Sequence, residues 1–155
     1  MTLHVVRHAA AGDRSSWKGP DQLRPLDRVG MAQALGLAHL LGDLPVKRVL
    51  SSRYVRCTQT VQRLAERLDL EVETHEALAE EADPARTWAL LEELGGTETV
   101  LCTHGNLVGP LLDRLQRQGV ELVAEDWACQ KGSVWSLEPD GEGGFSRATY
   151  LSPPA

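Results

Sequence analysis

The sequence has little that would suit a nucleic-acid-binding, membrane or secreted protein. Its formal net charge is −6 and its pI is near 5.3, whereas binding to nucleic acids or anionic membranes generally needs a basic surface. No apolar run approaches the roughly 18 residues of a membrane-spanning helix. Arg7 also precedes any apolar stretch that could serve as a signal peptide. We therefore expect a cytoplasmic protein that binds neither nucleic acid nor membrane.

Cysteine and lysine are also scarce. The three cysteines are an odd number and form no Cys-x-x-Cys pair, so neither a disulfide framework nor a structural zinc site is indicated. We expect no metal or other cofactor. Only three of the 16 basic residues are lysines, which leaves 13 arginines. Because the planar guanidinium group suits phosphate and carboxylate, an arginine-rich anion pocket is compatible with the acidic net charge.

What remains is the composition of one folded domain. The chain has 155 residues, of which 42% are hydrophobic and 25% charged, and these values are near the average for soluble globular proteins. It contains no evident repeat, low-complexity block or linker, and its length favours one domain over two. The sequence therefore predicts a single domain over residues 1–155.

Short apolar runs alternate with amphipathic stretches, a pattern typical of strands alternating with helices. Strands are expected at Leu3–Val6, Val46–Leu50, Leu70–Thr74, Thr99–Thr103, Ser133–Leu137 and Phe145–Tyr150. Helical spacing of apolar residues predicts helices around 31–41, 57–68, 84–94 and 107–115. The acidic residues of the third strand favour a sheet edge. This order predicts an α/β fold, a three-layer α/β/α sandwich with a mostly parallel central sheet.

Basic residues follow three of these strands directly. They are Arg7-His8, the segment Ser51–Arg56, and His104-Gly105. Functional groups of parallel sheets gather beyond the carboxyl ends of the strands, so the two histidines are expected to face each other. Gly105 would let the backbone approach a bound group. An arginine at a helix start, such as Arg56, opposes the helix dipole and therefore needs an anion from the protein or a ligand.

Four segments resemble the histidine phosphatase superfamily, which includes the cofactor-independent phosphoglycerate mutases. They are Leu3–Ala9 with its Arg-His pair, Ser51–Thr60, Leu78–Glu80 with an acid, and Val100–Gly105 with the second histidine. Their order and spacing agree over nearly the full length. The chain looks like the short members without insertions, namely the small phosphohistidine phosphatases and the phosphatase domains fused to Nudix hydrolases. The resemblance implies the phosphoglycerate mutase-like fold.

The resemblance also implies a mechanism without metal. His8 would be the nucleophile of a two-step phosphoryl transfer through a phosphohistidine, with its other ring nitrogen donating to a backbone carbonyl. Arg7, Arg56 and His104 would hold the transferring phosphate oxygens, and His104 would take part in catalysis. Glu80 would protonate the leaving group and then activate water.

The identity of the acid stays open at this stage, because Glu81 and Asp13 are alternatives to Glu80. Asp13, Arg14 and Trp17 form a possible substrate loop. Trp17 would either stack on a substrate ring or anchor the loop. Short relatives often carry a basic residue near Ala10–Ala11, and here Arg14, Lys18 or Arg53 could replace it. His4, His39 and His75 have no motif around them and are expected to be ordinary strand, helix and loop residues.

The predicted function is a metal-independent phosphatase of phosphomonoesters or phosphoramidates, protein phosphohistidine included. Its substrate would be a phosphorylated small molecule or a phosphoprotein, and the sequence predicts no oligomeric state. A non-catalytic phosphate-binding or scaffold protein on the same fold is the alternative. A phosphomutase is less favoured, because mutases carry insertions that cover the site and this length leaves no room for them.

Overall fold

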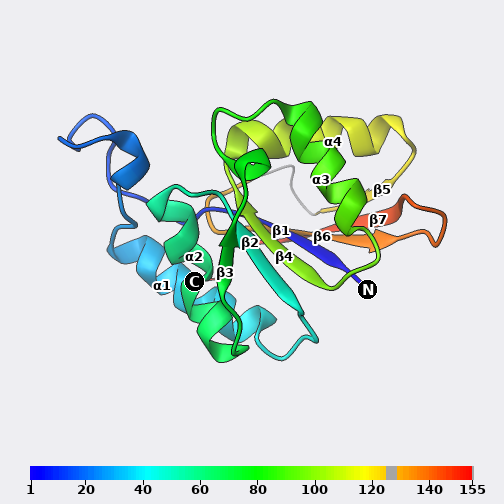
Figure 1. The fold of residues 1–155 in the computed structure, drawn as a ribbon, viewed down its shortest axis with the longest axis horizontal. Helices are drawn as coiled ribbons and strands as arrows, with labels where there is room; N and C mark the ends of the chain where they lie inside the picture. The colour runs from blue at the N-terminus through cyan, green and yellow to red at the C-terminus, as the bar shows by residue number, and fades with distance from the viewer. Residues whose placement is uncertain (125–128, 155) are drawn as a thin grey trace.

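The computed structural model describes residues 1–124 and 129–154. Their strands form one seven-stranded sheet in the order β3-β2-β4-β1-β6-β7-β5 (Figure 1). The strands are β1 (Leu3–Arg7), β2 (Arg48–Ser51), β3 (Val72–Thr74), β4 (Thr99–Thr103), β5 (Glu121–Val123), β6 (Val134–Pro139) and β7 (Phe145–Leu151). Neighbours pair in parallel except that β6 is antiparallel to both β1 and β7. The acidic strand β3 lies at an edge, as expected.

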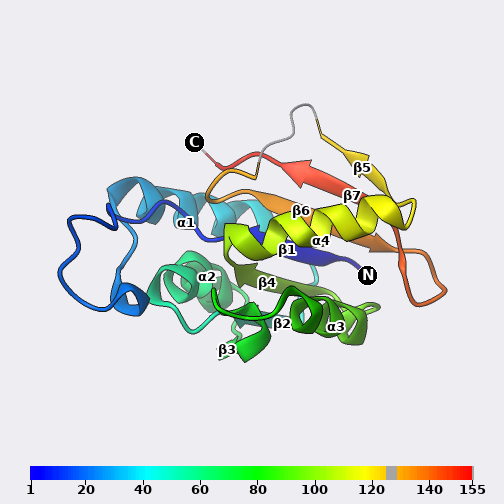
Figure 2. The ribbon, with the colours of Figure 1, turned by 90° about the horizontal axis from the view of Figure 1, so that it is seen from above.

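Helices cover both faces of this sheet (Figure 2). The helices are α1 (Arg28–Leu41), α2 (Val55–Arg67), α3 (Pro84–Leu94) and α4 (Gly105–Arg117), with short 3-10 turns η1 (Asp21–Leu23) and η2 (Glu76–Leu78). Alternate residues of a strand point to opposite faces. Val6 accordingly packs in one hydrophobic cluster with residues of α1 and α2, and Val5 packs in a second cluster with residues of α3 and α4. The predicted three-layer α/β/α sandwich is confirmed.

Local sequence signals explain the best-matched boundaries. β4 and α3 begin and end where the sequence predicted. The Asp83 side chain accepts a hydrogen bond from the backbone N–H of Ala85 and caps α3, and Pro84 takes the first helical position, where its missing N–H costs nothing. The sequence analysis missed β5, which has three residues and pairs only with β7 at the far edge.

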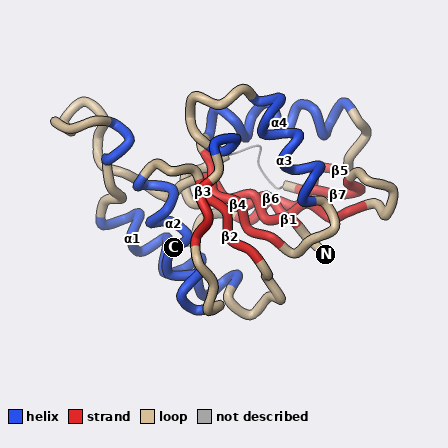
Figure 3. The backbone as a smooth tube through the Cα atoms, viewed as in Figure 1, coloured by secondary structure: helices blue, strands red, loops and turns tan. Residues whose placement is uncertain are grey.

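The carboxyl ends of β1, β2 and β4 lie on one side of the sheet, because these strands are parallel neighbours. From that side the long loop between β1 and α1 projects away from the body, interrupted by η1 (Figure 3). At the end of the chain, Pro154 packs against Gly36 of α1 so closely that a Cβ atom there would lie 2.3 Å from the Pro154 Cβ. Within residues 1–124 and 129–154, every helix is too short or too polar to cross a membrane.

Candidate functional site

Two histidines lie side by side at the carboxyl ends of neighbouring strands. His8 follows β1 and His104 follows β4, and the parallel register aligns Arg7 with Thr103 just before them. Their ring centroids are 5.4 Å apart, with an edge-to-face arrangement. Both side chains are buried. The fold thus brings together two imidazoles that are far apart in the sequence.

Among the described residues, His8 has a hydrogen-bond partner for only one of its two ring nitrogens. Its Nδ1 lies 2.8 Å from the carbonyl oxygen of Ala9. A carbonyl only accepts, so Nδ1 carries the proton of the neutral ring and Nε2 keeps its lone pair. Burial and, to a smaller extent, the charges of Arg56, Arg7 and Lys131 outweigh the Ala9 hydrogen bond and together lower the pKa of His8 to about 4. His8 is therefore a neutral imidazole at pH 7.

The partners of His104 allow its proton to lie on the opposite ring nitrogen. Its Nε2 lies 2.8 Å from the hydroxyl of Ser52 and 3.5 Å from the Cys57 Sγ, and the Ser52 hydroxyl also accepts a hydrogen bond from the N–H of Tyr54. When the Ser52 hydroxyl donates to Nε2, the ring proton is on Nδ1. This Nδ1 is buried, lacks a hydrogen-bond partner among the described residues, and lies 3.7 Å from a carboxylate oxygen of Glu80.

The electrostatics keep His104 neutral as well. Burial and, to a smaller extent, the neighbouring His8 and Arg56 together lower its pKa to about 3, against the opposing charges of Glu81 and Asp21. A neutral His104 donates from Nδ1 without adding a third full positive charge beside the two arginines.

Arg56 is the second residue of α2 and is 1% exposed. Its guanidinium donates to the backbone carbonyl of Asp21 at 3.0 Å and to the Asp21 carboxylate at 3.1 Å, and it also pairs with Glu80. The anion that a helix-start arginine requires is thus supplied by the protein, from η1 on one side and from the segment after η2 on the other.

Gly105 makes room for the guanidinium of Arg7. A Cβ atom at this position would lie 2.8 Å from the Arg7 Cζ and Nε atoms, so any side chain there would force the Arg7 guanidinium to move. The sequence analysis expected the glycine to admit a bound group, whereas the space it leaves is filled by Arg7. The Arg7 guanidinium also donates to the carbonyl of Cys129.

These groups surround one cavity of about 250 Å³. It is lined by Arg7, His8, Arg14, Arg56, Glu80, His104, Gly105 and Asn106. Three of the lining residues carry a buried nitrogen without a hydrogen-bond partner among the described residues: Nε of Arg7, Nε of Arg56 and Nδ1 of His104. Unsatisfied buried donors are costly and uncommon in native structures. The cavity therefore suits an anion with several acceptor oxygens.

The three candidate acids have different surroundings. Glu80 lines the cavity, and its backbone carbonyl accepts a hydrogen bond of 2.7 Å from the Asn106 side chain. Glu81 lies outside it, where hydrogen bonds from the side chains of Arg53 and Tyr54 lower its pKa to about 2. Asp13 is exposed and accepts from the N–H of Ser15, which lowers its pKa.

The loop residues singled out in the sequence separate in space. Arg14 lines the cavity and lies 3.4 Å from a carboxylate oxygen of Glu80. Trp17 is away from it, with its Nε1 donating to the Pro20 carbonyl at 2.9 Å. Lys18 does not line the cavity, and Arg53 is paired with Glu81. Of the basic residues proposed to replace the absent one, only Arg14 reaches the site.

Several residues of the site escaped the sequence analysis. Asp21 pairs with Arg56, Ser52 and Tyr54 form the hydrogen-bonded chain to His104, and Asn106 supports Glu80. Ser52 and Asn106 stand beside recognised motif residues, a signal that could have found them. Asp21 has no such signal, because only the fold of the loop brings it to α2. In the part of the chain that the structure describes, no group of three or more His, Cys, Asp or Glu side chains could hold a metal ion.

The family model described as "Histidine phosphatase superfamily (branch 1)" matches residues 3–83. This range is more than half of the chain and includes Arg7, His8, Arg56 and Glu80. The chain belongs to the histidine phosphatase superfamily. The prediction of a histidine phosphatase is thereby confirmed at the level of the family, while His104 lies beyond the matched range.

Comparison with individual proteins and solved structures shows similarity over nearly the whole chain, beyond the range of the family model. The 8-oxo-(d)GTP phosphatase of Mycolicibacterium smegmatis is 38% identical over 159 residues, covering 99% of this chain and 48% of that protein. The chain thus spans about half the length of this relative. The structure of the protein histidine phosphatase SixA complexed with tungstate is 25% identical with a TM-score of 0.74, covering 100% of this chain and 97% of that one. A mycobacterial glucosyl-3-phosphoglycerate phosphatase, 18% identical with a TM-score of 0.72 and 99% of each chain covered, shows the same fold.

Proposed function

We propose that residues 1–155 form one histidine phosphatase domain that hydrolyses phosphomonoesters or phosphoramidates without a metal ion, through a covalent phosphohistidine on His8. One observation carries this proposal: His8, whose Nε2 has no partner among the described residues, lines the same cavity as three residues that each have a buried, unsatisfied nitrogen. A nucleophile beside several donors is the arrangement that phosphoryl transfer requires, since catalysis there is mostly positioning and charge stabilisation.

In the first step, the Nε2 lone pair of His8 attacks phosphorus and the bond to the leaving group breaks. The Ala9 carbonyl holds the proton on Nδ1 throughout, so Nε2 is the reacting atom. A pKa near 4 keeps the imidazole unprotonated and nucleophilic over the physiological range.

The phosphoryl oxygens are held by Arg7, Arg56 and His104. The guanidinium groups supply charge and His104 donates from Nδ1, toward oxygens that gain negative charge in the transition state. Arg56 is fixed by Asp21 and His104 by Ser52, so these donors are positioned before the substrate arrives.

Glu80 serves as the general acid and then as the base that activates water against the phosphohistidine. It is favoured over Glu81 and Asp13 because it lines the cavity and lies beside both Arg56 and His104. Glu81 is held ionised by Arg53 and Tyr54 and does not line the cavity. Proton transfer by such a positioned group contributes about 10²–10⁴-fold to the rate.

Two classes of substrate are supported by the relatives. SixA is named as a protein histidine phosphatase, and the mycobacterial relative acts on 8-oxo-(d)GTP as a whole protein of twice this length. We infer a phosphorylated small molecule or a phosphoprotein for this chain. A protein that merely binds phosphate would not need the free His8 Nε2, which is the observation against that alternative.

The test is hydrolysis of p-nitrophenyl phosphate in the presence of a chelator, by wild type, His8→Ala and His39→Ala. His39 is an exposed histidine of α1 that contacts Arg67 far from the cavity, which makes it a matched control. We expect turnover by wild type and His39→Ala and its complete loss in His8→Ala.

The intermediate is tested separately by rapid quenching with a ³²P-labelled substrate. A phosphohistidine is labile to acid and stable to alkali, and its label should appear on wild type but not on His8→Ala. Unchanged turnover of His8→Ala would refute the mechanism, and phosphate binding without any turnover would favour the scaffold alternative.

A further inference from the structure

A second cavity adjoins the candidate catalytic cavity. Its volume is about 340 Å³, and it shares Arg7, His8 and Arg14 with the first. Arg24 and Lys131 complete a lining with four cationic side chains, against which only Asp13 is anionic. In a chain of net charge −6, this concentration of positive charge beside His8 indicates an anion-binding function. We call this second cavity the Lys131 pocket.

The backbone around Lys131 is tied directly to the His8 loop. The N–H of Gly132 lies 3.0 Å from the carbonyl oxygen of Arg7 and 3.1 Å from that of His8. From the other side, the Gln33 side chain donates to the Lys131 carbonyl at 3.3 Å and accepts from the N–H of Ala10 at 2.9 Å. Lys131 is therefore held at a defined place beside the nucleophile, although it is distant in sequence.

Lys131 is also the cation of this pocket that is available to a ligand. Its side chain is exposed, and its ammonium has no ion pair or hydrogen bond among the described residues, while its charge contributes to the lowered pKa of His8. Arg24, by contrast, is 5% exposed and donates to the Asp21 carboxylate and the Gly12 carbonyl. Arg24 thus contributes fixed charge to the wall, and Lys131 can contact a bound anion.

We propose that the Lys131 pocket binds the inner phosphate of a substrate that ends in a diphosphate, while His8 takes the terminal phosphate. The two cavities share a wall, as two phosphates joined by one oxygen require. This inference rests on the proposed function. The His8 Nε2–phosphorus bond forms as the bridging phosphorus–oxygen bond breaks, and the nucleoside or other monophosphate leaves. Water then cleaves the phosphohistidine and releases orthophosphate.

The test compares ADP with AMP as substrates of wild type, Lys131→Met and Lys18→Met. A charge-assisted hydrogen bond corresponds to about tenfold or more in affinity. We therefore expect the ratio of kcat/KM for ADP to that for AMP to fall about tenfold in Lys131→Met. Lys18 is exposed in the loop after β1 and lines neither cavity, so Lys18→Met should keep the wild-type ratio. An equal loss on both substrates in Lys131→Met would overturn the proposal, because Lys131 would then act on His8 alone.

A binding experiment separates this proposal from the proposed function. Calorimetry with inorganic pyrophosphate and orthophosphate on His8→Gln, which lacks the proposed nucleophile, should show tighter binding of pyrophosphate by about tenfold, and a smaller difference when Lys131→Met is added. Equal affinities for the two anions in His8→Gln would overturn the Lys131 pocket. Tighter binding of pyrophosphate without turnover of any phosphate compound by wild type would instead leave the pocket standing and refute the phosphatase.

Discussion

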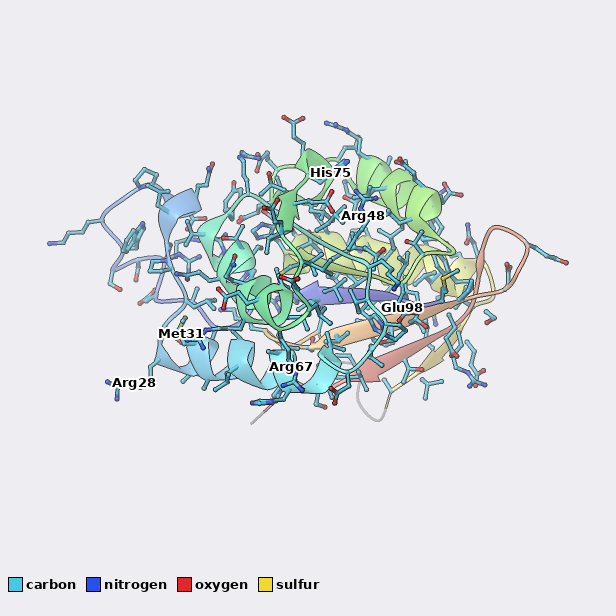
Figure 4. All side chains as sticks on the ribbon, turned by 60° about the horizontal axis from the view of Figure 1, so that its bottom comes forward. Arg28, Met31, Arg48, Arg67, His75 and Glu98 are labelled. Carbon is cyan, nitrogen blue, oxygen red and sulfur yellow. The ribbon has the colours of Figure 1, made fainter. Side chains whose placement is uncertain are left out.

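One buried histidine, His4, lies near the amino end of β1 and another, His8, directly follows its carboxyl end, and the two differ in what their nitrogens contact. His4, near the amino end, has both ring nitrogens paired: Nδ1 lies 2.8 Å from the Ser136 hydroxyl and Nε2 lies 3.0 Å from the Glu98 carboxylate. Glu98 also accepts from the N–H of Thr2 at 2.8 Å; it is labelled in Figure 4, near the amino end of β1. His8, past the carboxyl end, has a partner for Nδ1 only.

The comparison teaches that burial alone does not distinguish a structural histidine from a functional one. His4 is as buried as His8, and its network closes on itself, so it ties the start of the chain to β4 and β6. At the other end, His8 and His104 each have one nitrogen without a hydrogen-bond partner in the part of the chain that the structure describes. Unsatisfied polar atoms in a cavity are the sign of a missing ligand, because a folded protein rarely leaves them so.

The largest loss of kcat is expected when His104 is replaced. His104→Ala removes the Nδ1 donor from the cavity, and the loss of one such donor lowers kcat by about 10²–10³-fold. His4→Ala removes an equally buried imidazole from the other end and should leave kcat within about twofold, measured well below its unfolding temperature. Comparable losses of kcat in both variants would show that the two ends do not differ in function.

The second prediction separates two adjacent carboxylates. Glu80→Gln cannot transfer a proton to the leaving group, so its kcat on an alkyl phosphate such as AMP, whose leaving group is strongly basic, should fall about 10²-fold. Glu81→Gln keeps the shape and removes only a charge outside the cavity, and its kcat should remain near the wild-type value. Steady-state kinetics on the two variants decide between them, and the reverse order of losses would assign the acid to Glu81.

The third prediction concerns stability at the amino end. His4→Leu leaves the Glu98 carboxylate and the Ser136 hydroxyl without their partner, and it should lower the free energy of unfolding by about 2–3 kcal/mol. Urea denaturation followed by circular dichroism measures this. A matched variant, His39→Leu, replaces an exposed histidine and should change stability by less than about 0.5 kcal/mol. An unchanged midpoint for His4→Leu would mean that the network contributes nothing.

The smallest expected effect is in the pH dependence of stability. The pKa of His8 is about 4 in the folded protein, below the value of about 6.5 that a histidine has in an unfolded chain, so between these values the unfolded chain binds more protons. The free energy of unfolding therefore has its full value, as far as His8 is concerned, above pH 6.5, and it decreases as the pH falls toward 4. At pH 5 this loss is about 2 kcal/mol.

His8→Gln removes this titration. Between pH 7 and pH 5, its free energy of unfolding should therefore fall about 2 kcal/mol less than that of wild type, in parallel urea titrations. Identical pH dependence for the two proteins would contradict the lowered pKa of the imidazole.

Much of the fold could be predicted because its elements are defined by local patterns. The five buried residues of β4 and the Asp-Pro start of α3 each contain their own boundary signals. Strand β5 could not be predicted from the sequence, because its three partly exposed residues show no periodicity and the strand forms only against β7. For the site, Arg7, His8, Arg56 and His104 were found because each stands in a motif directly after a strand or at a helix start.

The sequence by itself determined the layer order, the family and the side chains that converge at the strand ends, because alternating strands and helices place those ends at one edge. Only the tertiary structure decided which nitrogens stay unpaired, that Gly105 makes room for Arg7, and that Lys131 stands beside His8. These features depend on contacts between residues distant in the chain. The residue type at one position does not reveal such contacts, because the backbone hydrogen bonds and close packing that create them come from other elements.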